Sequence, residues 1–168
     1  MFEQPYLEEL DISPFVDRLG ELASEDLAAA GIRLDIGTAS PWEGTLRVRA
    51  DARALQQVFL NLLTNARDAL AGRYDPTIRV RVLRDVNLVK LEMEDNGCGM
   101  SAREQSELFK PFRTNKPKGT GLGLVIVKKM LAAMDATIEI ESVEGEGSRA
   151  VISFPAFDYR STTRPPRF

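Results

Sequence analysis

The chain has 168 residues, of which 43% are hydrophobic and 28% are charged, and its formal net charge is −3. These values are typical of one globular domain, and they exclude a fibrous repeat, pervasive disorder and a general electrostatic attraction to nucleic acid. Histidine is absent and Cys98 is the single cysteine, which excludes an intrachain disulfide, a multi-cysteine metal cage and histidine as a general base. Because no apolar stretch is long enough to span a bilayer and the start is acidic, we expect a soluble, cytoplasmic segment, even if a longer protein carried a membrane anchor elsewhere.

The first half of the chain alternates between helical and strand patterns. Apolar residues recur at spacings of three and four over 13–30, which predicts an amphipathic helix that ends at Gly31. Period-two alternation predicts strands over 32–36 and 46–48, and the Ser-Pro-Trp-Glu-Gly turn between them favours a hairpin. Asp51 is a suitable N-cap for a second helix, whose expected buried stripe is Leu55, Val58, Phe59, Leu62, Leu63, Ala66 and Leu70.

The second half contains two predicted hairpins. Strands over 78–82 and 89–93 flank an Asp-Val-Asn turn, and strands over 138–140 and 150–154 flank a Gly-Glu-Gly turn. Between the hairpins we expect a short helix over 101–108, an irregular basic segment and a third long helix over 122–134. Since every strand alternates, one face of the sheet should be wet and the other covered by helices. The fold class is therefore an α/β two-layer sandwich, with a mixed, mostly antiparallel sheet of about five strands and three helices on one face.

The stretch Lys118–Leu124 reads KGTGLGL and lies directly before the third long helix. It fits neither the Walker loop nor the Rossmann turn, because its lysine precedes the glycines and a large apolar residue stands where the last small residue belongs. Glycines next to a helix N-terminus nevertheless favour an anion, since they allow close approach and unpaired N–H groups point at the ligand. The alternative is a glycine-rich connection with no ligand.

A second glycine loop, Asp95–Met100, follows a predicted strand. Its Gly97-x-Gly99-x-x-Ala102 spacing matches the Rossmann pattern, but no full helix and parallel strand follow, so we reject that interpretation. The carboxylate of Asp95, at the end of an apolar strand, is instead suited to accept a hydrogen bond from a ligand amine in an apolar pocket.

A polar face is predicted on the second helix, where Gln57, Asn61, Asn65 and Asp68 are spaced four, four and three apart. Asparagine is a mediocre helix former, and its carbonyl is a hard, neutral ligand that suits Mg²⁺, so the pair at positions 61 and 65 suggests a metal and phosphate site. An exposed helix face without a ligand is the alternative. The basic segment 109–118, with Phe109 and Phe112 among its lysines, is typical of a lid that closes on a polyphosphate.

These stretches, taken together and in order, resemble the catalytic ATP-binding domain of sensor histidine kinases, in the family that also contains gyrase, MutL and the heat-shock chaperone ATPases. The resemblance covers about 15–155. It rests on motifs similar to the N, G1, F, G2 and last glycine boxes, namely LQQVFLNLLTNARDAL (55–70), MEDNGCGM (93–100), LFKPF (108–112), GTGLGL (119–124) and GEGS (145–148). The lid wording is most similar to kinases of the nitrogen-regulation and dicarboxylate-sensing type, and the implied fold is the Bergerat ATP-binding fold.

The resemblance implies ATP and Mg²⁺ as cofactors and a role for each matching residue. Asn65 would bind Mg²⁺, Asp95 would accept a hydrogen bond from the adenine amino group, and Lys116 would reach the phosphates from the lid. Asn61 stands where ATP-hydrolysing relatives have a glutamate, and an amide cannot take a proton from water. The remaining expected nucleotide-binding residues are Asp68, Gly97, Gly99, Met100, Phe109, Phe112, Gly119, Thr120, Gly121, Leu122, Gly123, Leu124 and Ser148.

The absence of histidine departs from what the resemblance implies, because such kinases phosphorylate a histidine on a two-helix dimerisation domain. We therefore expect 1–12 to be a linker remnant, 13–156 the catalytic domain and 157–168 a flexible tail. The expected partners are a histidine-bearing dimerisation domain and, downstream, a response regulator, with no nucleic acid, no membrane span in this segment and a monomeric isolated domain. A stand-alone ATPase of the same fold and a degenerate docking module are the alternatives.

Overall fold

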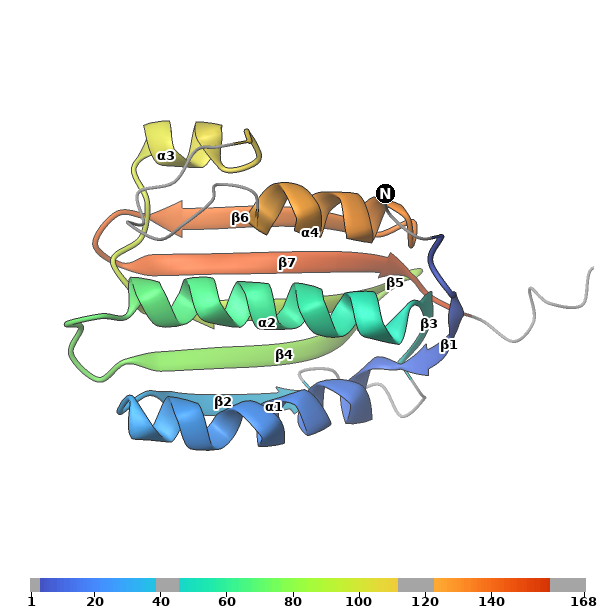
Figure 1. Ribbon diagram of the computed structural model, residues 1–168, viewed down its shortest axis with the longest axis horizontal. Coiled ribbons are helices and arrows are strands. Elements are labelled where there is room, and N and C mark those ends of the chain that lie inside the picture. The colour runs from blue at the N-terminus through green and yellow to red at the C-terminus, as the bar shows by residue number, and fades with distance from the viewer. Residues whose placement is uncertain (1–3, 39–45, 112–122, 158–168) are drawn as a thin grey trace, which may run out of the picture.

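The computed structural model describes residues 4–38, 46–111 and 123–157 of the chain. Figure 1 shows helices packed in one layer against a twisted sheet. The helices are α1 (Ile12–Ala29), α2 (Ala52–Ala69), α3 (Ala102–Glu107) and α4 (Gly123–Ala132). The strands are β1 (Glu8–Asp11), β2 (Arg33–Thr38), β3 (Arg47–Ala50), β4 (Thr77–Asp85), β5 (Leu88–Asp95), β6 (Thr137–Val143) and β7 (Gly147–Pro155).

The main sheet has five strands in the order β2-β4-β5-β7-β6. Only β2 and β4 pair in parallel, and the other neighbours are antiparallel. The long helices α1, α2 and α4 lie over the same face of this sheet, while the short α3 lies beyond its β6 edge (Figure 1). The predicted two-layer α/β sandwich and the hairpins β4–β5 and β6–β7 are therefore confirmed.

The predicted hairpin between 32–36 and 46–48 is wrong. β2 instead pairs in parallel with β4, and β3 pairs with β1 in a separate two-stranded sheet. The physical reason is α2: its apolar stripe must cover the sheet, so the chain crosses over from β2 through α2 and returns in the same direction as β4. Alternation in the sequence shows that a segment is a strand, but it does not show which strand is its neighbour.

The start of the chain is held on the domain. The segment expected as a linker contains β1, which pairs antiparallel with β3. The backbone N–H of Tyr6 also donates to the Asp51 carboxylate at 3.0 Å, and Ile12 is fully buried. These contacts place the first turn of α1 firmly against the two-stranded sheet.

One hydrophobic core lies between the helix layer and the sheet. All seven residues of the predicted stripe on α2 are buried, and the largest fully buried side chains are Phe59 on α2 and Phe154 on β7. Asp51 caps α2 as predicted, since its carboxylate accepts the backbone N–H groups of Arg53 and Ala54. In the part of the chain that the structure describes, no helix is long and apolar enough to cross a membrane.

Candidate nucleotide site

Asp95 is the last residue of β5. Among the described residues it is the single buried charged side chain, with 9% of its surface exposed. The pairing register places it between Ile78 of β4 and Ser148 of β7. Burial raises the pKa of its carboxyl, and hydrogen bonds from the backbone N–H groups of Gly97 and Ser148 oppose that rise. A carboxylate held by backbone donors at the end of a buried strand is well placed to accept one more hydrogen bond from a ligand.

The glycine loop after β5 is packed so closely that side chains would not fit. A Cβ atom on Gly97 would lie 2.6 Å from the carbonyl oxygen of Ala69, and one on Gly99 would lie 2.1 Å from that of Val143. Gly99 also has a φ of +65°, which favours glycine. The two glycines therefore let the loop lie directly on the end of α2 and on the end of β6.

Gly147, the first residue of β7, also allows a close approach of two backbone segments, here of β7 to the end of β5. It was not predicted as a site residue. Its φ is +138°, and a Cβ atom there would lie 2.0 Å from the backbone oxygen of Asp95. In the sequence, Gly147 lies in the Gly-Glu-Gly turn and in the GEGS motif (145–148), but of that motif only Ser148 was predicted as a nucleotide-binding residue. The close approach of β7 to Asp95 is set by strand pairing, which the pattern does not contain.

A hydrogen-bond cluster joins the loop to the last hairpin. The backbone N–H of Met100 donates to the Ser142 hydroxyl at 2.8 Å, and that hydroxyl lies 2.8 Å from the Ser148 hydroxyl. The amide of Gln105 on α3 donates to the carbonyls of Met100 and Ser142 at 3.1 and 3.0 Å. Ser142 and Gln105 were not predicted as site residues, because neither lies in a glycine or asparagine motif.

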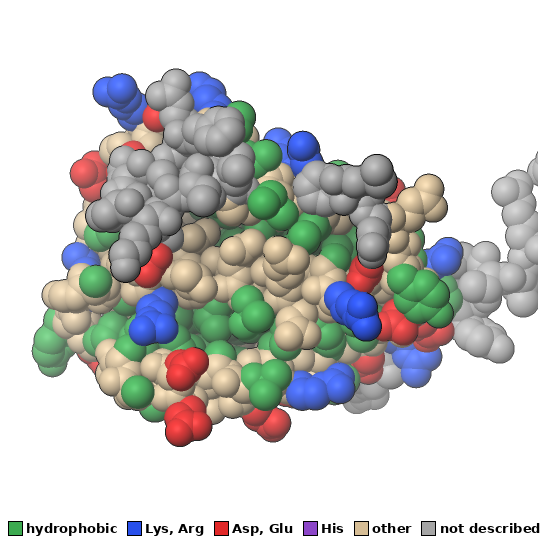
Figure 2. All heavy atoms as spheres, viewed as in Figure 1, with side chains coloured by type: hydrophobic (Ala, Val, Ile, Leu, Met, Phe, Trp, Pro, Cys, Tyr) green, Lys and Arg blue, Asp and Glu red, His purple; other side chains and the backbone are tan. Residues whose placement is uncertain are grey.

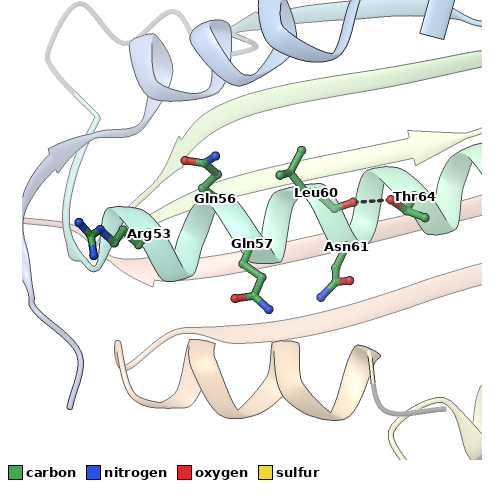
Figure 3. A pocket seen from close by; sticks show the side chains of 6 residues that line it. All are labelled: Arg53, Gln56, Gln57, Leu60, Asn61 and Thr64. Carbon is green, nitrogen blue, oxygen red and sulfur yellow. Dashed lines mark hydrogen bonds between the residues drawn. The ribbon is translucent and has the colours of Figure 1, made fainter. Parts of the chain in front are cut away.

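The predicted polar face lies on the outer side of α2. Figure 3 shows Gln57 and Asn61 pointing toward α4, whereas Gln56 and Leu60 point toward α1. Asn61 and Asn65 are half-buried, and Asp68 is exposed. An open groove of about 380 Å³ runs along this helix, but Asn61 is the one candidate site residue among the six that line it. Asp95, which the resemblance predicts to contact the adenine base, does not line this groove.

The N-terminus of α4 faces Asn61. The amide oxygen of Asn61 lies 4.0 Å from the point where a Cβ atom would stand on Gly123, the first residue of α4. Leu124, the next residue, packs against the hydrophobic core. The first N–H groups of a helix have no partner within the helix, and the positive end of the dipole lies there, so this end of α4 presents both near Asn61.

Part of the predicted lid lies outside the described residues, namely Phe112, Lys116, Gly119, Thr120, Gly121 and Leu122. Phe109 is described and half-buried, and its ring lies 4.9 Å from the ammonium group of Lys128 on α4. This cation–π contact ties the segment after α3 to α4. Of the basic residues in the predicted segment 109–118, the structure describes only Lys110, which is exposed.

A magnesium ion would depend on amide oxygens at this site. Among residues 4–38, 46–111 and 123–157, no group of three His, Cys, Asp or Glu side chains could hold a metal. Asn61, beside the start of α4, and Asn65, one turn further along α2, carry neutral amide oxygens. Mg²⁺ usually keeps several waters and takes charge compensation from substrate phosphates. The donor set fits a magnesium ion that arrives with a polyphosphate, and it does not fit a permanently bound metal.

The glycine loop after Asp95 contacts the C-terminal end of α2, the helix that carries Asn61 and Asn65. Gly97 lies against Ala69, and the backbone N–H of Cys98 donates to the Ala69 carbonyl at 2.9 Å. Ala69 lies four residues, or about one helical turn, beyond Asn65. The structure thus places the Asp95 loop about one turn along α2 from Asn65 and about two turns from Asn61, which lies beside the start of α4.

The chain matches one protein family and several known proteins. Residues 50–158 match the family described as "Histidine kinase-, DNA gyrase B-, and HSP90-like ATPase". The chain is 34% identical over 146 residues to the sensor histidine kinase ZraS of Klebsiella oxytoca, which covers 87% of this chain and 31% of that protein. It is 40% identical over 111 residues to the C4-dicarboxylate transport sensor protein DctB of Rhizobium meliloti (strain 1021), which covers 66% of this chain and 17% of that protein.

A solved structure supports the same assignment. The catalytic domain of the histidine kinase ThkA in a nucleotide-free form matches with a TM-score of 0.77 and 25% identity, covering 90% of this chain and 96% of that one. The chain spans less than one third of the length of the two curated relatives. The family match, the curated relatives and the solved structure all give the same assignment. The chain belongs to the histidine kinase-, DNA gyrase B- and HSP90-like ATPase family, as the catalytic ATP-binding domain of a sensor histidine kinase.

Proposed function

We propose that this domain binds Mg-ATP between the Asp95 loop, α2 and α4, and presents the γ-phosphate to a histidine on a dimerisation domain, for onward transfer to a response regulator. The observation that carries the proposal is the burial of Asp95 beside the close-packed Gly97 and Gly147. The loop after Asp95 contacts α2 at Ala69, about one helical turn from Asn65. We further propose that the domain works on the cytoplasmic side of the membrane and is monomeric when isolated.

The base end of the site would recognise adenine. Asp95 would accept a hydrogen bond from the adenine amino group, and Gly97, Gly99 and Met100 would form the wall beside the ring. Ser148 supports this role because its backbone N–H donates to the Asp95 carboxylate. A neutral amide at position 95 would replace one acceptor oxygen with a donor, so Asp95→Asn should lose affinity for the base.

The phosphate end would hold the charge. Asn65 would supply an oxygen ligand to magnesium, Asn61 would hydrogen-bond beside it, and the N-terminus of α4 with Gly123 and Leu124 would receive phosphate oxygens. Magnesium, when bound, would neutralise developing charge on the transferred phosphoryl group. The other proposed phosphate and lid contacts are Asp68, Phe109, Phe112, Lys116, Gly119, Thr120, Gly121 and Leu122.

Transfer to an external acceptor is favoured over hydrolysis by Asn61. An amide cannot remove a proton from water, so this site positions ATP without generating hydroxide. The chain contains no histidine, so the acceptor must lie outside the sequence described here. A longer kinase chain that contains this domain, or a separate partner, would supply it.

Titration of the chain with a fluorescent ATP analogue, with and without Mg²⁺, tests the proposal. We expect Asp95→Asn to weaken binding in both conditions and Asn65→Ala to remove most of the magnesium dependence. Asp17→Asn and Asn87→Ala are matched controls, since both residues are exposed, Asp17 lies on α1, and Asn87 lies in the β4–β5 turn at the opposite end of β5 from Asp95. Absence of binding to the wild type would overturn the nucleotide site, and rapid ATP hydrolysis by the chain alone would overturn the assignment to phosphotransfer.

A further inference from the structure

Arg73 lies in the connection between α2 and β4, outside every motif that the sequence analysis singled out. Its side chain is half-buried and makes two hydrogen bonds to backbone carbonyls. The Nε atom donates to the carbonyl of Asn96 at 3.2 Å, and Nη2 donates to the carbonyl of Gly145 at 2.7 Å. One side chain therefore bridges two loops that are 49 positions apart in the sequence.

The two bridged loops are those that surround Asp95. Asn96 directly follows Asp95, and its side chain is fixed by accepting the Thr77 N–H at 2.8 Å and donating to the Asp75 carbonyl at 3.0 Å. Gly145 lies in the β6–β7 turn, and its N–H donates to the Cys98 carbonyl at 2.7 Å. Figure 1 shows the α2–β4 connection, the start of the segment after β5 and the β6–β7 turn at the same end of the sheet.

An arginine suits this bridge better than any other side chain. Its guanidinium is planar, always charged and carries five donors in a fixed fork, so it can hold two carbonyls in a fixed relative position. The carbonyls it holds belong to the segments that carry Gly97 and Gly147. A Cβ atom would lie 2.7 Å from Asp95 Oδ1 if it were added to Gly97, and 2.0 Å from the Asp95 backbone oxygen if it were added to Gly147. A change in the distance between the loops would therefore move the groups that surround the Asp95 carboxylate.

We propose that Arg73 is a positioning residue for the base end of the nucleotide site. It sets the affinity and selectivity for the adenine base by fixing the loops on either side of Asp95, and it has no part in magnesium binding or in phosphoryl transfer. The proposal rests on the assignment of Asp95 as the adenine acceptor.

The test compares Arg73→Met and Arg73→Lys with a matched control, Arg81→Met. Arg81 also donates to two backbone carbonyls, those of Asp35 and Val80, but it lies on strand β4 away from the Asp95 loops. Displacement of a fluorescent ATP analogue by ATP, ADP and GTP gives the affinities, and urea unfolding of each variant gives the stability.

We expect Arg73→Met to weaken the binding of ATP and of ADP by the same factor, about tenfold, because both hydrogen bonds of the bridge are lost and only part of that loss reaches the base end of the site. The preference for ATP over GTP should fall, and the Mg²⁺ concentration that half-saturates ATP binding should not change. Arg73→Lys keeps the charge but cannot span both carbonyls, so it should recover at most part of the loss. Arg81→Met should lower stability while leaving the ATP to GTP preference at the wild-type value.

Two results would overturn the proposal. One is an Arg73→Met variant that is folded, as shown by cooperative urea unfolding, and keeps wild-type ATP affinity and base preference. The other, decisive if Arg73→Met does not fold, is an Arg73→Lys variant with unchanged affinity and preference. Failure of the adenine site itself is distinguishable, because Asp95→Asn would then bind ATP as the wild type does.

Discussion

The Asp95 carboxylate accepts the backbone N–H of Gly97 at 2.9 Å, and the same Oδ1 atom lies 2.7 Å from the point where a Cβ atom would stand on Gly97. Any side chain at position 97 would therefore displace the proposed adenine acceptor. We expect Gly97→Ala to cost about 1–3 kcal/mol of unfolding free energy through overpacking and to weaken ATP binding. Urea unfolding and nucleotide titration measure the two effects.

Gly37→Ala is the control for this substitution. A Cβ atom on Gly37 would meet its nearest neighbour, on Arg81, at an ordinary contact distance of 3.7 Å. We expect this variant to change stability by less than about 0.5 kcal/mol, as surface substitutions usually do, and to bind ATP normally. If Gly97→Ala behaved like Gly37→Ala, the tight packing of the loop would not matter for binding.

The stability of the domain should depend on the protonation of Asp95. Burial raises the pKa of this carboxyl above the ordinary value of 3.8. The native state then holds the proton to a higher pH than the unfolded chain does, so this carboxyl reduces stability as the pH rises from 3.8 through its folded pKa. Asp95→Asn cannot titrate, and every other group is common to both proteins.

We therefore expect the unfolding free energy of the wild type, relative to that of Asp95→Asn, to decrease as the pH is raised through that window and to be constant above it. Urea unfolding at a series of pH values measures the difference. An increase with pH would mean that the backbone N–H groups of Gly97 and Ser148 outweigh burial.

A glutamate at position 61 should convert the site toward hydrolysis. Asn61 is half-buried on α2 and faces the start of α4. A carboxylate there can act as a general base for water, an effect on the order of 10²-fold or more where the geometry is favourable. We expect Asn61→Glu to raise ATP hydrolysis by the isolated chain, measured as phosphate release, while Asn61→Gln does not. An equal rise in both variants would show that side-chain length, and not basicity, limits hydrolysis.

The N-caps of the two long helices should differ in their contribution to stability. Asp51 accepts the N–H groups of Arg53 and Ala54 at 3.0 and 3.2 Å, whereas Asp11, at the start of α1, makes no capping hydrogen bond. Among the described residues, Asp11 Oδ1 is buried without a hydrogen-bond partner. Asp51→Ala removes the two cap bonds and the bond from the Tyr6 N–H, so we expect it to cost at least about 1 kcal/mol, whereas Asp11→Ala should be neutral or stabilising, as measured by urea unfolding. Equal losses would contradict the cap assignment.

Local patterns were sufficient for most elements of this fold. The stripe on α2, its Asp51 cap and the hairpins β4–β5 and β6–β7 all follow from spacings of a few residues, because helix periodicity, capping and tight turns are short-range effects. The same spacing placed Asn61 and Asn65 on one face of α2. The partner of β2 could not be predicted in this way, since it depends on where α2 packs.

The sequence by itself determined the kinds of element, the apolar faces that must be covered and the residue types that suit a nucleotide and a magnesium ion. Tertiary structure alone decided that β7 approaches Asp95 closely enough to require Gly147, and that Arg73 reaches the carbonyls of Asn96 and Gly145. The reason is physical: backbone carbonyls are present at every position, so the sequence does not show which of them an arginine will meet. Strand pairing and the packing of α2 bring those loops together, and only then do the contacts around Asp95 exist.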